Sequence, residues 1–217
     1  MALAFDAGSG SNDGGGAATS LTWSHTCTGS ELVLLVGAFL DNLTSDTITG
    51  VTYNGVALTK ILGAVGSSNE GYMTFWYLIA PATGAHNVVV SFTPANNISA
   101  CALSLTGSDP TAPIDSSNSG TNGGGSTLTL ATTVVSGGCW LATIGGSLDD
   151  SLSANTGMVV RANDSRGVLQ IGDSNAIVGT GSQSLIWNIG SRNGGLVLSI
   201  KPKPSGGGGA SLLAFLG

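Results

Sequence analysis

The residues that could do catalytic chemistry are few and scattered. The chain has two histidines, His25 and His86, and two glutamates, Glu31 and Glu70. No Gly-x-Ser-x-Gly motif occurs that would place a serine nucleophile on a strand-to-helix turn. The only adjacent carboxylates, Asp149-Asp150, fall in a polar segment that reads as a solvated turn, whereas sugar hydrolysis needs two positioned carboxylates in a cleft. The sequence therefore predicts a protein that is not an enzyme.

One pair of residues has spacing that could suit a transition metal. His25 and Cys27 are two residues apart, so both would lie on one face of a strand. Zinc needs two further ligands, and no Cys-x-x-Cys or His-x-x-x-His motif supplies them. With Trp23 on the same face, His25 is predicted to be a packed core histidine.

Other ligand patterns are weak. Asp41-Asn42 with Asp46, or Asp149-Asp150, could group oxygen ligands for calcium. The glycine-rich segments match neither the phosphate-binding loop nor the dinucleotide fingerprint, and none precedes an expected helix. We expect no cofactor.

The composition points to an uncharged polar surface. Only 8% of the 217 residues are charged, against roughly 25% in an average globular protein, and the net charge is −6. The six cations are scattered, so no basic stripe is available to neutralise phosphates, and no nucleic-acid partner is expected. A surface of hydroxyls and amides is typical of phage virion proteins, extracellular adhesins and sugar-binding modules.

The cysteines and the first residues bear on localisation. Cys27, Cys101 and Cys139 each lie in an apolar run, which favours reduced, buried thiols, with one disulfide plus a free thiol as the alternative. Met1-Ala-Leu-Ala-Phe-Asp has no features of a secretory signal. No apolar run approaches the length of a membrane span, so no membrane partner is expected. These features favour folding in a reducing cytoplasm followed by release within a particle.

The hydrophobic pattern predicts strands and almost no helix. Leu21 to Cys27 alternates between apolar and polar residues, as in a half-buried strand. Glu31 to Leu40 is nearly all apolar, as in a central strand buried on both faces. Asn54-Gly55 fits a type I′ hairpin turn. Further strands are expected at Tyr72 to Ala80, Asn87 to Phe92, Ile98 to Leu105, Thr127 to Thr133, Cys139 to Ile144, Met158 to Ala162, Val168 to Ile171, Ser184 to Ile189 and Leu196 to Lys201.

This strand pattern predicts an all-β fold, a single antiparallel β-sandwich that resembles a jelly roll, with extended N- and C-terminal segments. The domain spans residues 1–204 and includes a long polar connection at about 107–126. A faint internal echo is present, because Ala102-Leu-Ser-Leu-Thr-Gly closes the first half and Leu196-Val-Leu-Ser-Ile-Lys closes the second.

The last segment differs in kind from the rest. Residues 205–209 form a glycine-rich tether, and residues 210–217 form an apolar octapeptide. Exposed apolar segments of this kind mark interaction sites. We predict a docking arm for a partner or a second copy, although the arm could instead fold back onto its own domain. The predicted partner-docking residues are Leu212, Leu213, Phe215 and Leu216.

Several core and turn segments are similar to those of a known group of domains. They are Ser20-Leu-Thr-Trp-Ser-His-Thr, Glu31-Leu-Val-Leu-Leu-Val-Gly, Val51-Thr-Tyr-Asn-Gly-Val-Ala-Leu-Thr-Lys60, Phe75-Trp-Tyr-Leu-Ile-Ala-Pro81-Ala-Thr-Gly84 and Leu198-Ser-Ile-Lys-Pro202. Together they resemble β-sandwich domains found in bacteriophage structural proteins and bacterial surface proteins. The resemblance implies a fold and brings no catalytic or ligand-binding residues with it.

Two functional hypotheses follow. The first is a structural component of a bacteriophage virion, such as a capsid decoration protein or a head or tail fibre subunit, that forms homo-oligomers and contacts other virion proteins. The alternative is a carbohydrate-binding adhesin or receptor-binding module, with a glycan as its partner. The alternative needs exposed aromatic side chains among Phe75, Trp76, Tyr77, Trp140 and Trp187, which are otherwise expected to pack in the core.

Overall fold

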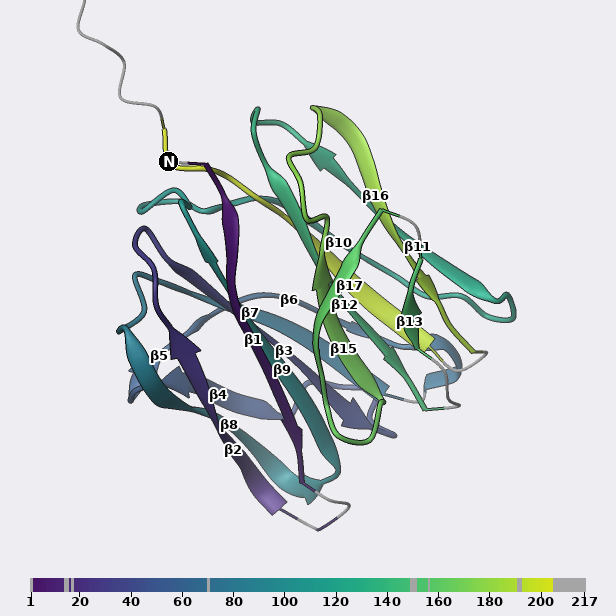
Figure 1. Cartoon of the computed structure of the whole chain (residues 1–217). Helices are drawn as coiled ribbons and strands as arrows, with labels where there is room; N and C mark the ends of the chain where they lie inside the picture. Colours follow the sequence, from purple (N-terminus) through teal and green to yellow (C-terminus); the bar gives the residue numbers. More distant parts are fainter. Residues whose placement is uncertain are drawn as a thin grey trace, which may run out of the picture.

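The protein is all-β in a computed structural model that describes residues 2–13, 16, 18–69, 71–148, 152–155, 157–190 and 193–204 (Figure 1). This part contains seventeen strands and one turn of 3-10 helix, η1 (Ser67–Asn69). The strands are β1 (Ala4–Asn12), β2 (Ala18–Cys27), β3 (Val33–Asp41), β4 (Ile48–Tyr53), β5 (Val56–Ala57), β6 (Thr59–Val65), β7 (Gly71–Ile79), β8 (Gly84–Asn96), β9 (Ile98–Thr106), β10 (Ile114–Gly120), β11 (Thr127–Val134), β12 (Trp140–Ser147), β13 (Ser153–Ala154), β14 (Val159–Asn163), β15 (Leu169–Asp173), β16 (Gly181–Asn188) and β17 (Asn193–Ile200).

The strands form four antiparallel sheets stacked in four layers (Figure 1). The outer sheet β2-β8-β4-β5 packs on the sheet β1-β9-β3-β7-β6, which packs on β10-β17-β12-β15-β14, which packs on the outer sheet β11-β16-β13. The prediction of an all-β antiparallel fold is confirmed. The prediction of a single two-layer sandwich is corrected, because three apolar cores separate four sheets instead of one core separating two.

The two middle sheets are buried on both faces. In β3, Leu34 and Val36 point into the core shared with the outer sheet, whereas Leu35 and Phe39 point into the core between the middle sheets. Successive strand residues face opposite sides, so a strand between two cores must be apolar at nearly every position. This confirms the prediction that Glu31 to Leu40 contains a strand buried on both faces.

The strand order is duplicated. The sheet β1-β9-β3-β7-β6 has the same order as β10-β17-β12-β15-β14 when β1 is matched to β10, β3 to β12, β6 to β14, β7 to β15 and β9 to β17. The outer sheets match in the same way, with β2, β8 and β4 equivalent to β11, β16 and β13. We call residues 4–106 the first repeat and residues 114–200 the second repeat.

Backbone irregularities recur at equivalent places in the two repeats. A β-bulge at Asp6 in β1 is repeated at Asp115 in β10, and a bulge in β6 is repeated in β14. Gly84 and Gly181 begin β8 and β16 with positive φ values of 99° and 95°. Bulges and left-handed glycines are specific local features, so their repetition supports one topology used twice.

The repeats pack with approximate two-fold symmetry. β1 contacts β14 while β6 contacts β10, and β9 contacts β15 while β7 contacts β17. Such reciprocal pairs are the signature of an isologous interface. At its centre the equivalent residues Gly37 and Ile144 meet, because a Cβ on Gly37 would lie 2.4 Å from Ile144 Cγ2. The chain is therefore a pseudo-dimer within one polypeptide.

Of two local predictions, the hairpin turn is confirmed and the long polar connection is corrected. Asn54 and Gly55 have φ values of 50° and 76°, as the type I′ hairpin requires. The polar segment 107–126 is not one long connection, because β10 lies within it and forms the edge of a middle sheet. That strand has no apolar alternation, since its exposed residues Ser117, Asn118 and Ser119 lie on the edge of the sheet.

Candidate functional site

Two equivalent seams join an outer sheet to a middle sheet, and buried polar side chains bridge each of them. The first seam is the contact of β1 with β2, and the second seam is the contact of β10 with β11. In each seam the edge strands of two sheets lie side by side without forming a ladder. Side chains therefore make the polar connections between the two sheets.

The bulge carboxylate of the first seam connects three strands. Asp6 accepts a hydrogen bond from Ser104 Oγ of β9 at 2.6 Å and from the backbone N–H of Thr28, just after β2, at 3.2 Å. A bulge re-aims one side chain out of the regular alternation. Here it turns the carboxylate toward the seam, so Asp6 ties the middle sheet to the outer one.

The bulge carboxylate of the second seam does the same. Asp115 accepts hydrogen bonds from Ser199 Oγ of β17 at 3.4 Å and from the backbone N–H of Val135 at 2.8 Å. Burial opposes ionisation of Asp115, but hydrogen bonds from Val135 and Ser136 outweigh it and lower the pKa of the carboxyl group. The carboxylate is therefore ionised at neutral pH.

A directed chain of hydrogen bonds fills the first seam. Trp23 Nε1–H donates to Ser9 Oγ at 3.0 Å, and Ser9 lies 2.8 Å from His25 Nδ1. On the other side, His25 Nε2 lies 3.1 Å from Ser104 Oγ, which donates to Asp6. Since Ser104 donates onward, it accepts the His25 Nε2–H, and Ser9 then donates to Nδ1. The chain fixes His25 as the neutral Nε2–H tautomer.

Electrostatics agree with a structural role for this histidine. His25 is 1% exposed, and this burial lowers its pKa to about 4, against a smaller raising effect of Asp6. A base with so low a pKa is a poor general base at neutral pH. The prediction of a packed core histidine is confirmed. Cys27, on the same face of β2, is fully buried and packs in the same core.

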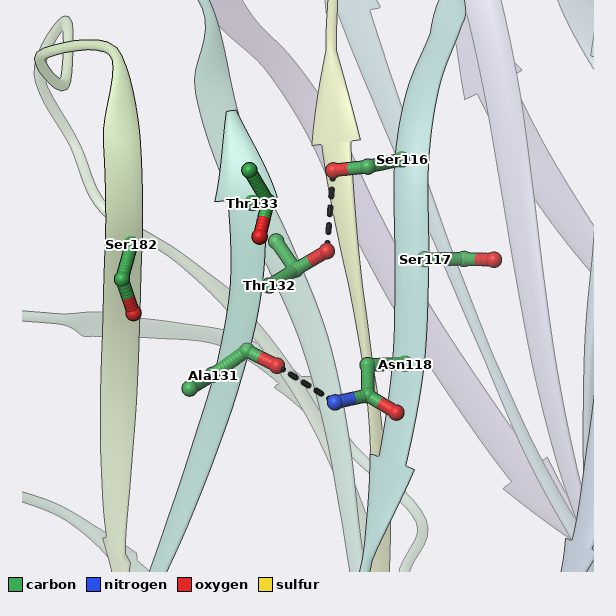
Figure 2. Close-up of a pocket in the computed structure, with 7 residues that line it drawn as sticks. All are labelled: Ser116, Ser117, Asn118, Ala131, Thr132, Thr133 and Ser182. Atoms are coloured by element: carbon green, nitrogen blue, oxygen red, sulfur yellow. Dashed lines mark hydrogen bonds between the residues drawn. The ribbon is translucent and has the colours of Figure 1, made fainter. Parts of the chain in front are cut away.

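The second seam has smaller side chains at the places of Trp23 and His25. From the strand register, Thr132 is equivalent to His25 and Leu130 to Trp23, because Val134 and Cys27 pair with the equivalent glycines of β16 and β8. A groove of about 350 Å³ opens here (Figure 2). Its side chains come from three strands and are Ser116, Ser117, Asn118, Thr132, Thr133 and Ser182, with Ala131 between them.

Side-chain hydrogen bonds hold the groove in shape. Thr132 Oγ1 donates to Ser116 Oγ at 2.8 Å, and Asn118 Nδ2 donates to the Ala131 carbonyl at 2.8 Å. Figure 2 shows both bonds crossing from β10 to β11, with Ser117 pointing away from β11. No charged residue is among those that line the groove. The arrangement can exchange hydrogen bonds with a ligand but offers no acid, base or nucleophile of altered pKa.

One cluster of charged side chains joins the two repeats. Arg166, in the turn between β14 and β15, donates to Asp41 at 3.0 Å and to Ser99 at 3.0 Å, both in the first repeat. It also lies 3.8 Å from the fully buried Asp164. Burial raises the pKa of Asp41, and Arg166 opposes that rise. Arg161 forms a second buried pair with Asp173, at 2.8 Å.

Two large apolar side chains are exposed at one end of the second repeat. Val135 is 73% exposed and Ile177 is 60% exposed. They lie at the same end, because Cys139 bonds both to the backbone of Ser136 through its thiol and to the N–H of Val178 through its carbonyl. A groove lined by Asp109, Ser136, Gly137 and residues 201–204, two of which are lysines, lies beside Val135. The described chain therefore ends next to the two exposed apolar side chains.

Several predicted residues lie outside the described residues. These are Leu212, Leu213, Phe215 and Leu216 of the docking arm, together with Asp149-Asp150 and Glu70. Asp41 and Asp46, the other proposed calcium ligands, are in separate ion pairs with Arg166 and Lys60.

The remaining predicted residues are in the cores. Cys27, Cys101 and Cys139 are free and buried, as predicted. Phe75, Trp76, Trp140 and Trp187 are buried and Tyr77 is partly buried, so these aromatic side chains pack in the core and form no exposed strip. No group of three or more metal-ligating side chains occurs among the described residues, and no helix there is long and apolar enough to cross a membrane.

The sequence signal for the seams was weak. Ser9, Ser104 and Asp6 are far apart in sequence and of types that are frequent in this chain, so neither composition nor spacing singles them out. The echo between Leu103-Ser104-Leu105 and Leu198-Ser199-Ile200 was the one usable sign. This echo aligns Ser104 with Ser199 in the sequence. The two serines donate hydrogen bonds to Asp6 and Asp115, the two bulge aspartates.

Comparisons with known protein families, curated proteins and solved structures do not assign this chain to a family. No family model matches this chain, and no curated protein matches it in sequence. A solved structure described as the B domain of a biofilm associated protein covers 91% of this chain and 72% of that chain, with 9% sequence identity and a TM-score of 0.27. A TM-score this low assigns neither a topology nor a function. The protein is a duplicated, four-layer β-sheet protein.

Proposed function

We propose that this protein is a structural subunit of a multi-copy particle, a bacteriophage virion, in which it serves as a capsid decoration protein or a head or tail fibre subunit. In this role it is not an enzyme. It assembles with further copies of itself and with other virion proteins, and residues 205–217 supply an apolar attachment to a neighbour.

The observation that carries the proposal is the pair of exposed apolar side chains at one end of the second repeat. Val135 and Ile177 are the two most exposed large apolar side chains of the described residues, and the chain continues from Pro204 beside them toward an apolar octapeptide. Apolar surface of this kind is stable in water when another surface covers it. Burying the four large side chains of the arm would contribute roughly 1.5–3 kcal/mol each.

The outer faces of the molecule suit repeated packing. The outward side chains of β2 are Ser20, Thr22, Ser24 and Thr26, and those of β11 include Thr127, Thr129 and Thr133. These side chains carry no charge, so they add no like-charge repulsion where copies meet.

The test is the mass of the purified protein in solution, for the full chain and for a chain that ends at Ser205. We expect an oligomer that falls to a monomer on truncation, and the same fall for the double variant Val135→Ser, Ile177→Ser. Val56→Ser is the matched control, since Val56 is a 53% exposed valine in the first repeat. A full chain that is monomeric at every concentration would contradict self-assembly.

The alternative of an aromatic-platform adhesin is less well supported. It needs exposed rings, and the aromatic side chains considered for it are buried or partly buried. A carbohydrate site would have to rely on hydrogen bonds instead.

A further inference from the structure

The groove at the second seam offers space for a ligand, and its residues differ from those at the equivalent places in the first seam. In the first seam the indole of Trp23 and the imidazole of His25 occupy the interior and are 8% and 1% exposed. Leu130 and Thr132 stand at the equivalent places in the second seam, and only Thr132 lines the groove. The groove opens at the surface, where Thr133 and Ser182 are exposed, and its volume of about 350 Å³ is near the lower end of the range for small-molecule sites.

The groups at the groove are neutral donors and acceptors. Thr132 donates to Ser116, so the hydroxyl hydrogen of Ser116 is not used in that bond and can be donated to a ligand. The Asn118 amide donates one N–H to the Ala131 carbonyl, and its second N–H can be donated to a ligand. The exposed hydroxyls of Thr133 and Ser182 stand directly opposite each other in the β11–β16 ladder.

The same chemistry argues against other ligand classes. An anion such as a phosphate or a carboxylate requires a cation or a cluster of N–H donors, and no Lys, Arg or His lines the groove. A divalent cation requires carboxylates, and none lines it. A lipid or an aromatic ligand requires apolar walls, whereas five of the seven lining residues carry a hydroxyl and one an amide.

We propose that the groove between β10 and β11 is a binding site for a neutral glycan, one or two sugar rings long. The Ser116 hydroxyl and the Asn118 amide donate to sugar oxygens, and Thr133 and Ser182 exchange hydrogen bonds with the outward hydroxyls of the ring. The site lacks an aromatic platform, so affinity is weak, with a Kd on the order of 1 mM per site. Many copies in one particle would raise the effective affinity by avidity.

This site is independent of the structural role, and the two proposals fail separately. The first experiment presents the full chain to an array of neutral glycans and then titrates maltose, cellobiose, lactose and di-N-acetylchitobiose into 15N-labelled protein. We expect a saturable response from at least one sugar, with amide shifts concentrated at residues 116–118, 131–133 and 182. Absence of any saturable shift at tens of millimolar sugar, about ten times the expected Kd, would overturn the proposal.

A blocking variant tests the location. Thr133→Trp places a large ring over the groove from an exposed position, so we expect the response to weaken by at least about tenfold. Thr129→Trp is the matched control, because Thr129 is exposed on the same face of the same strand and does not line the groove. Equal binding by both variants, or shifts confined to another surface, would show that the groove is not the site. Preference for anionic over neutral sugars would also overturn it.

Discussion

The Asp6 carboxylate accepts a hydrogen bond from the Ser104 hydroxyl at 2.6 Å, and both residues recur in the second repeat as Asp115 and Ser199. The aspartate is the extra residue of a bulge each time, and the serine lies on the last strand of the repeat. A polar pair kept at equivalent places, while the residues around it differ, indicates that each repeat needs this connection between its two sheets.

The first prediction concerns this connection. Asp6→Ala leaves the Ser104 hydroxyl and the Thr28 N–H without their acceptor, so we expect the free energy of unfolding to fall by about 1–3 kcal/mol. Urea denaturation measures it. Glu31→Gln is the control, since the Glu31–Lys203 ion pair is partly exposed and should contribute no more than about 1 kcal/mol. Equal losses for the two variants would contradict the assigned role of Asp6.

The second prediction is a loss of stability in mild acid through His25. Burial lowers the folded-state pKa to about 4 from the usual 6.5. The unfolded chain therefore binds a proton that the folded chain does not between these values, and stability falls as the pH falls through this window. The maximum contribution is about 3 kcal/mol.

Denaturant midpoints measured from pH 7.5 to pH 4 test this dependence. His25→Gln should be less stable at pH 7.5 and should show a shallower fall with acid. His86→Gln removes the other histidine, which lies outside the hydrogen-bonded chain of the first seam, and should keep the steep fall. If His25→Gln is as steep as the unaltered protein, other groups govern the acid response.

Strand content was predictable here because its causes are local. The alternation from Leu21 to Cys27 and the apolar run of β3 follow from which faces are buried, and the glycine at position 55 fixes the hairpin. β1 and β10 were missed because their residues are small and polar and their place is set by pairing with β9 and β17. The duplication was nearly invisible, since equivalent positions hold different residues, such as Gly37 and Ile144.

The seams could not be predicted for a related reason. Each brings together side chains from three strands that are separated along the chain, as Ser9, His25 and Ser104 are. Serine is too frequent in this sequence for any one residue to stand out. The groove is lined by residues of β10, β11 and β16, which are separated along the chain and come together only in the fold.

A third prediction concerns the ion cluster that joins the repeats. Arg166→Met leaves the buried Asp164 and Asp41 without their cation, so we expect a loss of about 3–5 kcal/mol at pH 8. The loss should shrink as the pH falls, because burial already raises the pKa of Asp41 and its protonation removes one of the unpaired charges. Lys60→Met is the control, because the Lys60–Asp46 pair is partly exposed. A pH-independent loss for Arg166→Met would mean that its packing, and not its charge, is what matters.

The last prediction tests the centre of the pseudo-two-fold interface. A Cβ at Gly37 would lie 2.4 Å from Ile144 Cγ2, whereas a Cβ at Gly50 would have nothing within 4 Å. Gly37→Ala should therefore cost about 1–3 kcal/mol through overpacking, and Gly50→Ala should change stability by less than about 0.5 kcal/mol. Ile144→Ala alone should cost about 2–5 kcal/mol through its cavity.

In the double variant Gly37→Ala, Ile144→Ala the new methyl group enters the space that the isoleucine leaves. The summed losses of the single variants should then exceed the loss of the double variant by at least about 1 kcal/mol. Strict additivity would show that the two residues do not meet, and the packing of the two middle sheets would have to be different. A positive coupling would show that Gly37 and Ile144 pack against each other at the centre of the pseudo-two-fold interface.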